Sequence, residues 1–149
     1  MTTTAAIENE PERVQLDSEY KHSRPLTSCI WDSQNRYVFF GAEDNLVHRY
    51  DPQEKTSTSF TIHDSWVRAM AVSPNGELLA TGGYDGRLAW WSAAAKKPEA
   101  IRAIDAHQGW IRALSFSPDG STIATCGNDR LVKLWNVIDG KLSANCASV

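Results

Sequence analysis

The chain lacks most of the features that mark specialised classes of protein. Its three cysteines, Cys29, Cys126 and Cys146, form no C-x-x-C pair and leave an odd count. This spacing argues against a disulfide framework or a zinc site and favours reduced, partly buried thiols. No apolar run approaches the roughly 18 residues that a membrane-spanning helix needs. Lysine and arginine number 15 against 18 acidic residues, a net charge of −3, so no basic surface for nucleic acid is expected.

Targeting signals and phosphate-binding motifs are missing as well. The first residues, MTTTAAIENEPERV, have neither a basic start nor an apolar core, so we do not expect them to form a secretory signal peptide. We expect residues 1–12 to form a flexible polar lead and the protein to be cytoplasmic. Neither G-x-x-x-x-G-K-[ST] nor G-x-G-x-x-G occurs, so the SPNG and SPDG segments are interpreted as hairpin turns.

What the chain does contain is an internal repeat. His22, His63 and His107 are separated by 41 and then 44 residues, and these offsets bring whole segments into register. The aligned sets are an aspartate, an aromatic residue 28 positions after the histidine, and two turn positions: Asp44, Asp85 and Asp129; Tyr50, Trp91 and Trp135; Asn35, Gly76 and Gly120; Ala42, Gly83 and Gly127. The extra residues of the second interval fall in SAAAKKPEA, in a loop that tolerates insertion.

Each unit predicts four short strands joined by turns. In the second unit these are VRAMAV, LLATG, RLAWWS and AIRAI; in the third, IRALSF, TIATC, LVKLWNV and KLSAN; in the first, LTSCIW, YVFFG, LVHRY and STSFTI. A four-stranded repeat of about 40–45 residues is typical of a propeller blade. We therefore predict an all-β fold over residues 13–149, with three four-stranded antiparallel blades at about 22–62, 63–106 and 107–149. RVQL (13–16) is a candidate outer strand. KLSAN (141–145) is a candidate outer strand of the third blade, or in a longer ring it could be shared with the closure.

The repeat resembles that of the WD-repeat family of β-propellers. The interior FSPDGSTIATCGNDRLVKLW carries this resemblance, which extends from residue 22 to about residue 142. The family's repeat opens with Gly-His and closes with Trp-Asp. Here the glycine is missing each time and no closing pair is complete: Lys21-His22, Ile62-His63 and Ala106-His107 open the units, and Tyr50-Asp51, Trp91-Ser92 and Trp135-Asn136 close them.

The resemblance implies a hydrogen-bonded tetrad of histidine, hydroxyl, aspartate and tryptophan in each blade. By position, the second and third units supply complete sets: His63, Thr81, Asp85 and Trp91; His107, Thr125, Asp129 and Trp135. The first unit is degenerate, because Phe40 and Tyr50 accompany His22 and Asp44 in place of the hydroxyl and the tryptophan. A buried indole N–H or imidazole without a partner costs about 1–3 kcal/mol, which gives a physical reason for the recurrence.

The same polar residues have two other interpretations. His63, Asp85 and Thr81 could form a nucleophilic triad, but the trio recurs in the third unit, and an enzyme rarely builds its active site twice. We therefore expect no catalytic residues and no cofactor. The three repeated histidines could hold a metal, but their spacing places them in different blades, so no metal site is expected. His48 stands outside this pattern and is expected on the surface.

Four residues are candidates for binding a partner. Trp66 and Trp110 each follow the repeated histidine by three residues, and Arg68 and Arg112 lie two residues further on. The resemblance places them on the face where partners usually dock, and tryptophan and arginine are enriched at binding hot spots. The alternative is that the rings of Trp66 and Trp110 pack between neighbouring blades. Binding and packing are compatible if the rings are half-buried.

Three blades are fewer than the roughly four to eight that close a propeller, so two apolar faces would be left uncovered. Either the chain is part of a longer product, or copies assemble to complete a propeller, or the chain is truncated. We expect a non-enzymatic protein-interaction scaffold that binds proteins or peptides rather than nucleic acid or membranes. The alternatives are a regulatory or sensor part of a larger enzyme or signalling protein, and a truncated structural remnant.

Overall fold

The computed structural model describes residues 15–147, and their regular structure is entirely β. The strands are β1 (Leu26–Trp31), β2 (Val38–Ala42), β3 (Val47–Asp51), β4 (Thr56–Phe60), β5 (Val67–Val72), β6 (Leu78–Gly83), β7 (Arg87–Ser92), β8 (Ala100–Asp105), β9 (Ile111–Phe116), β10 (Thr122–Gly127), β11 (Leu131–Asn136) and β12 (Leu142–Ala147). Over this range no helix has the length and apolar character needed to cross a membrane.

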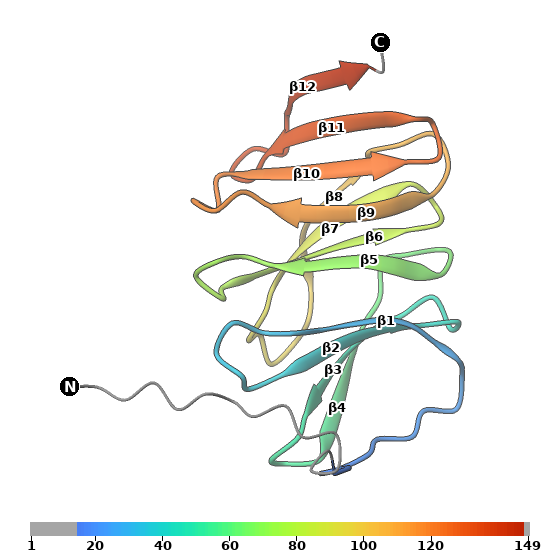
Figure 1. Cartoon of the computed structure of the whole chain (residues 1–149), viewed down its shortest axis with the longest axis vertical. Helices are drawn as coiled ribbons and strands as arrows, with labels where there is room; N and C mark the ends of the chain where they lie inside the picture. Colours follow the sequence, from blue (N-terminus) through green and yellow to red (C-terminus); the bar gives the residue numbers. More distant parts are fainter. Residues whose placement is uncertain (1–14, 148–149) are drawn as a thin grey trace, which may run out of the picture.

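The strands form three antiparallel four-stranded sheets, each a simple meander in chain order. Figure 1 shows the three blades stacked one after another, with β1, β5 and β9 side by side along the stack. The predicted fold class, an incomplete propeller of three blades, is confirmed. β12 is the outer strand expected around residues 141–145. Of the candidate outer strand RVQL, Gln15 and Leu16 lie outside any strand and the other two residues lie outside the described range; β4 is the outer strand of the first blade. The predicted flexible lead (1–12) lies outside the described residues.

The turns between the first two strands of each blade have a common backbone. Asn35, Gly76 and Gly120 all have positive φ, at 55°, 75° and 73°, a conformation that glycine and asparagine accept most readily. In the second blade Ser73 Oγ donates to Asn75 Oδ1 at 2.6 Å. The proline–glycine segments therefore form hairpin turns, as the sequence predicts.

Two apolar clusters hold the blades together. Between the first and second blades, Phe60 packs edge-on against Trp91, with ring centroids 5.2 Å apart. Between the second and third blades, Leu88 and Trp90 pack with Ile123. Fully burying each such side chain stabilises the fold by about 1.5–3 kcal/mol, so the contacts between blades are a substantial part of the apolar stabilisation.

The outer faces of the two end blades are open. Leu88 is fully buried by the third blade, whereas Val132, its counterpart one repeat later, is 42% exposed. At the other end Leu26 is 50% exposed, and its counterpart Val67 is buried. Of the cysteines, Cys126 is half-buried as expected, but Cys29 is exposed on β1, the edge strand of the first sheet, which is hydrogen-bonded only to β2. The side chain of Cys146 lies outside the described residues.

Candidate functional site

Four side chains of the second blade form a continuous hydrogen-bonded chain. The indole N–H of Trp91 on β7 donates to Thr81 Oγ1 on β6 at 2.9 Å. The same hydroxyl lies 2.9 Å from His63 Nε2, and His63 Nδ1 lies 3.2 Å from Asp85 Oδ2 in the turn between β6 and β7. We call this set the second-blade clamp.

The third blade repeats the arrangement with shorter distances. Trp135 Nε1 and His107 Nε2 each lie 2.8 Å from Thr125 Oγ1, and His107 Nδ1 lies 2.8 Å from Asp129 Oδ1. We call these four residues the third-blade clamp. Each clamp joins the loop before a blade to its second and third strands, so it fixes the geometry of the blade from within.

The electrostatics of the clamps favour an ionised aspartate. Burial alone would raise the pKa of Asp129, but hydrogen bonds from His107 and the backbone N–H groups of Leu131 and Gln108 outweigh it. The pKa of this carboxyl therefore lies below its usual value, and the pKa of Asp85 is lowered by the same balance of burial against hydrogen bonds.

The clamps lack the geometry of a nucleophilic triad. The hydroxyls of Thr81 and Thr125 are almost completely buried, and each accepts a hydrogen bond from a tryptophan indole. A catalytic nucleophile must face an open pocket next to an oxyanion site. These hydroxyls are therefore positioned to join strands rather than to attack a substrate.

The first blade has a different polar network. Asp44 Oδ2 lies 3.6 Å from His22 Nε2 and 2.9 Å from His48 Nε2. The ring of Phe40, at the hydroxyl position, stacks on His48 with centroids 4.9 Å apart, and Tyr50 packs against Tyr20. The expectation that His48 lies on the surface is wrong: it is only 4% exposed, because the rings of His22 and Phe40 cover it.

The predicted partner-binding tryptophans lie in one exposed row. Trp66 and Trp110, 40% and 41% exposed, flank Tyr84, which stacks on Trp110 at 4.3 Å with an interplanar angle of 8°. The guanidinium of Arg112 lies 4.9 Å from the centre of the Trp110 ring and donates to Asn128 Oδ1 at 2.8 Å. We call Trp66, Tyr84, Trp110 and Arg112 the aromatic row.

Arg68 and Tyr84 depart from the sequence argument. Arg68 is exposed on β5, but within residues 15–147 it has no cation–π contact like that of Arg112. Tyr84 was not predicted, because its counterparts Glu43 and Asn128 are not aromatic. Only the structure reveals its place: Tyr84 sits in the turn beside the entry to β5, and its backbone N–H donates to the Trp66 carbonyl at 2.9 Å.

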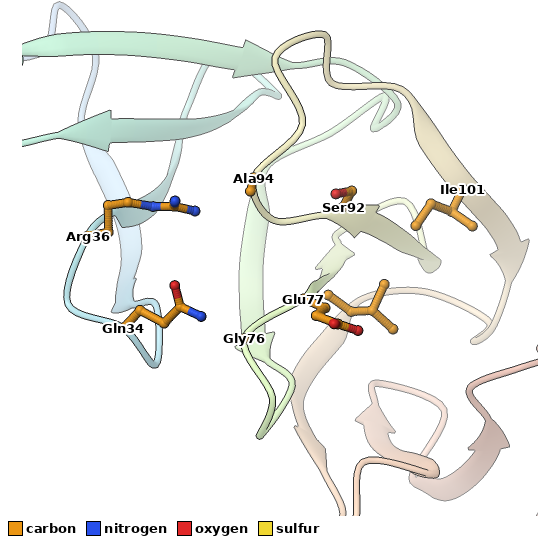
Figure 2. A pocket seen from close by; sticks show the side chains of 8 residues that line it. Gln34, Arg36, Gly76, Glu77, Ser92, Ala94 and Ile101 are labelled. Carbon is orange, nitrogen blue, oxygen red and sulfur yellow. The ribbon is translucent and has the colours of Figure 1, made fainter.

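A shallow hollow lies at the other end of β6 from the aromatic row. Figure 2 shows Gln34 and Arg36 of the first blade on one side, and Glu77, Ser92 and Ile101 of the second blade on the other. Its lining contains no histidine or cysteine, so the hydroxyl of Ser92 has no imidazole beside it in the hollow. The aromatic row is the more specific candidate for recognition.

Stacked four-stranded meanders with a repeated polar clamp define the class of propeller repeat proteins. The family model described as "WD domain, G-beta repeat" matches residues 54–92 and 98–136, just over half of the 149 residues. The chain belongs to the WD-repeat family.

Several curated proteins and solved structures are similar to the chain. It is 29% identical over 86 residues to the mitotic checkpoint protein bub-3 of Caenorhabditis elegans, covering 58% of this chain and 25% of that protein. It is 30% identical over 99 residues to the poly(A)+ RNA export protein of Schizosaccharomyces pombe, covering 58% and 27%. The chain thus spans about a quarter of the length of these relatives.

A solved structure supports the fold. A chain in the crystal structure of a mitotic checkpoint complex matches with a TM-score of 0.76 and 21% identity, covering 86% of this chain and 40% of that chain. WD-repeat proteins generally act as protein-interaction scaffolds and are typically not enzymes.

Proposed function

We propose that this chain is a non-enzymatic interaction module whose aromatic row binds a protein or peptide partner. The observation that carries the proposal is the stack of Trp66, Tyr84 and Trp110, capped by Arg112, on an exposed edge of the second and third blades. Membership of a family of scaffolds supports the general class, and the similar chain of known structure comes from a mitotic checkpoint complex.

The aromatic row suits recognition because it is already ordered. Tyr84 holds Trp110 in a parallel stack, and Asn128 holds the Arg112 guanidinium. A partner would immobilise few additional rotamers, and immobilising each rotamer-rich side chain otherwise costs about 0.5–1.5 kcal/mol. The rigid row therefore lowers the ordering cost of binding.

The chemistry of the row indicates the chemistry of the partner. The half-exposed indole faces of Trp66 and Trp110 offer apolar contact area, and aromatic anchors of this kind dominate binding energy. The exposed cation of Arg112, with Arg68 on the neighbouring strand β5, favours a carboxylate. We infer a peptide or loop that carries an apolar side chain next to an acidic residue.

A peptide selection tests this proposal. Peptides would be selected from a display library on the wild-type chain, and their affinities would be measured for the double variant Trp110→Ala/Arg112→Ala by fluorescence anisotropy. We expect binding to weaken by about tenfold or more, since hot-spot residues contribute about 2 kcal/mol or more. The matched control is Trp31→Ala, which removes a 53% exposed tryptophan from the far end of β1 and should leave binding unchanged.

Two results would contradict the proposal. If the selected acidic–apolar peptides bind the double variant as tightly as the wild type, the row is not the binding surface. If the double variant loses its cooperative unfolding transition, Trp110 and Arg112 belong to the core between blades rather than to a docking face.

A further inference from the structure

The polar network of the first blade brings three metal-ligating groups to one point. His22 Nε2 comes from the segment before β1, Asp44 Oδ2 from the turn between β2 and β3, and His48 Nε2 from β3. These atoms all lie within 4.8 Å of one another. Both imidazoles point their Nε2 atoms at the same carboxylate oxygen, at 3.6 and 2.9 Å.

The distances suit a small divalent cation. Zinc binds histidine nitrogen at about 2.0–2.1 Å and carboxylate oxygen at about 2.0–2.2 Å, so tetrahedral ligands lie about 3.4 Å apart. The two measured separations from Asp44 Oδ2 lie on either side of that value. These two pairs therefore need shifts of only a few tenths of an ångström, and the two imidazole Nε2 atoms, which lie within 4.8 Å of each other, would move closer together to complete a three-ligand site.

The loss of the clamp in the first blade explains why these groups converge. In the other blades the Nε2 atom of the repeated histidine bonds to a threonine, and Nδ1 meets the aspartate. Phe40 replaces that threonine, so His22 presents Nε2 to Asp44 instead. At the position of His48 the second blade has Ala89, and the third has Lys133, whose ammonium lies 3.5 Å from Asp129. Only the first blade places a second imidazole there.

Neighbouring groups orient the ligands. Asp44 Oδ1 accepts a hydrogen bond from Leu46 N–H at 3.0 Å, which leaves Oδ2 toward the histidines. His48 Nδ1 lies 3.1 Å from Ser59 Oγ. His22 Nδ1 lies 3.2 Å from Arg24 N and 3.4 Å from Arg24 O, so a metal on Nε2 would select the tautomer whose Nδ1–H faces the carbonyl. Such outer partners fix ring orientation in metal sites.

We propose that His22, Asp44 and His48 bind one Zn²⁺ ion, with the fourth position left to water or to a partner's side chain. Zinc accepts this mixture of two imidazoles and one carboxylate. The prediction of no metal site was based on the spacing of the three repeated histidines, His22, His63 and His107. His48 lies outside that repeat, so the spacing argument does not apply to the pair of His22 and His48.

Zinc titration of the untagged full chain tests the site. After treatment with EDTA and removal of the chelator, ZnCl₂ would be titrated at pH 7.5 by calorimetry. We expect saturable binding of about one ion per chain. In long-range ¹H–¹⁵N spectra of the imidazoles, zinc should shift the Nε2 signals of His22 and His48. The signals of His63 and His107 should not move, because both of their ring nitrogens are occupied.

Variants separate ligands from neighbours. Asp44→Asn and His22→Gln each remove a ligand and should abolish saturable zinc binding. Ser59 is not a ligand but hydrogen-bonds to His48, so Ser59→Ala should weaken zinc binding by about tenfold or more. Asp64→Asn is the matched control: it removes a 79% exposed carboxylate next to His63 and should change nothing. Two results with the wild-type chain would overturn the proposal: zinc binding that does not saturate, or zinc-induced shifts at His63 and His107 with none at His22 and His48. Neither result depends on whether a variant folds.

Discussion

Replacing Thr125 with valine tests whether the third-blade clamp stabilises the fold. Valine keeps the branched shape of the side chain but removes the hydroxyl that lies 2.8 Å from both Trp135 Nε1 and His107 Nε2. Both partners are buried, so water cannot replace the lost oxygen. A buried polar group without a partner costs about 1–3 kcal/mol. With two such groups left without a partner, we expect the free energy of unfolding to fall by about 2–6 kcal/mol.

The comparison that isolates this effect is Thr122→Val, the same substitution three residues earlier on β10. Thr122 is partly exposed, and its hydroxyl makes only a 3.4 Å contact with Ser121. Urea unfolding followed by tryptophan fluorescence would measure both variants. Thr122→Val should lie within about 0.5 kcal/mol of the wild type. Equal free energies of unfolding for the two variants would refute the role assigned to the clamp.

The clamps, the turns and the open faces lead to three further predictions. The pKa values of Asp85 and Asp129 are lowered in the folded chain. The stability that these carboxylates contribute should therefore be complete above the unfolded pKa of about 3.9 and be lost as the pH falls below it, and the double variant Asp85→Asn/Asp129→Asn should flatten this part of the curve of unfolding free energy against pH. Gly86→Ala should lower the melting temperature more than Gly120→Ala: both glycines have positive φ, but only at Gly86 would a Cβ collide with backbone carbonyls, those of His107 and Gly109. Equal losses would show that backbone strain alone matters. We propose that copies of the chain associate through the open faces of the end blades. Analytical sedimentation should then give a mass above that of one chain, and Val132→Glu, which places a charge on an open face, should restore the mass of a single chain. A single-chain mass for the wild type at all concentrations would contradict this proposal.

The sequence was informative wherever one physical requirement recurs in every repeat. Each blade needs a turn that accepts positive φ, and the aligned positions of Gly76 and Gly120 predicted where those turns fall. The repeated spacing also brought Thr125 and Trp135 into one register, and the structure places their side chains within hydrogen-bonding distance. Periodicity carries this information because similar units solve the same packing problem.

What departs from the repeat could not be obtained in this way. His48 was expected on the surface because it stands outside the repeated pattern of histidines. In the structure its ring is covered by Phe40, which occupies the threonine position, and its Nε2 atom lies 2.9 Å from Asp44. Tyr84 has no aromatic counterpart, and its role depends on Trp110 of the next blade. Contacts between units depend on how blades are stacked, which the alignment of units does not contain.

The clamps and the apolar clusters stabilise different levels of the structure. Each clamp joins residues of one repeat, such as His63 and Asp85, so a blade keeps its internal geometry without reference to its neighbours. The apolar clusters lie between blades, and in stacked repeats stability is the sum of unit and interface terms. The second blade has both faces covered, whereas Leu26 and Val132 on the end blades remain exposed. The end blades therefore have the strand geometry of a propeller, but their outer apolar faces are not fully buried. A protein surface that covers these faces would gain apolar contact without having to order the strands of the blades first.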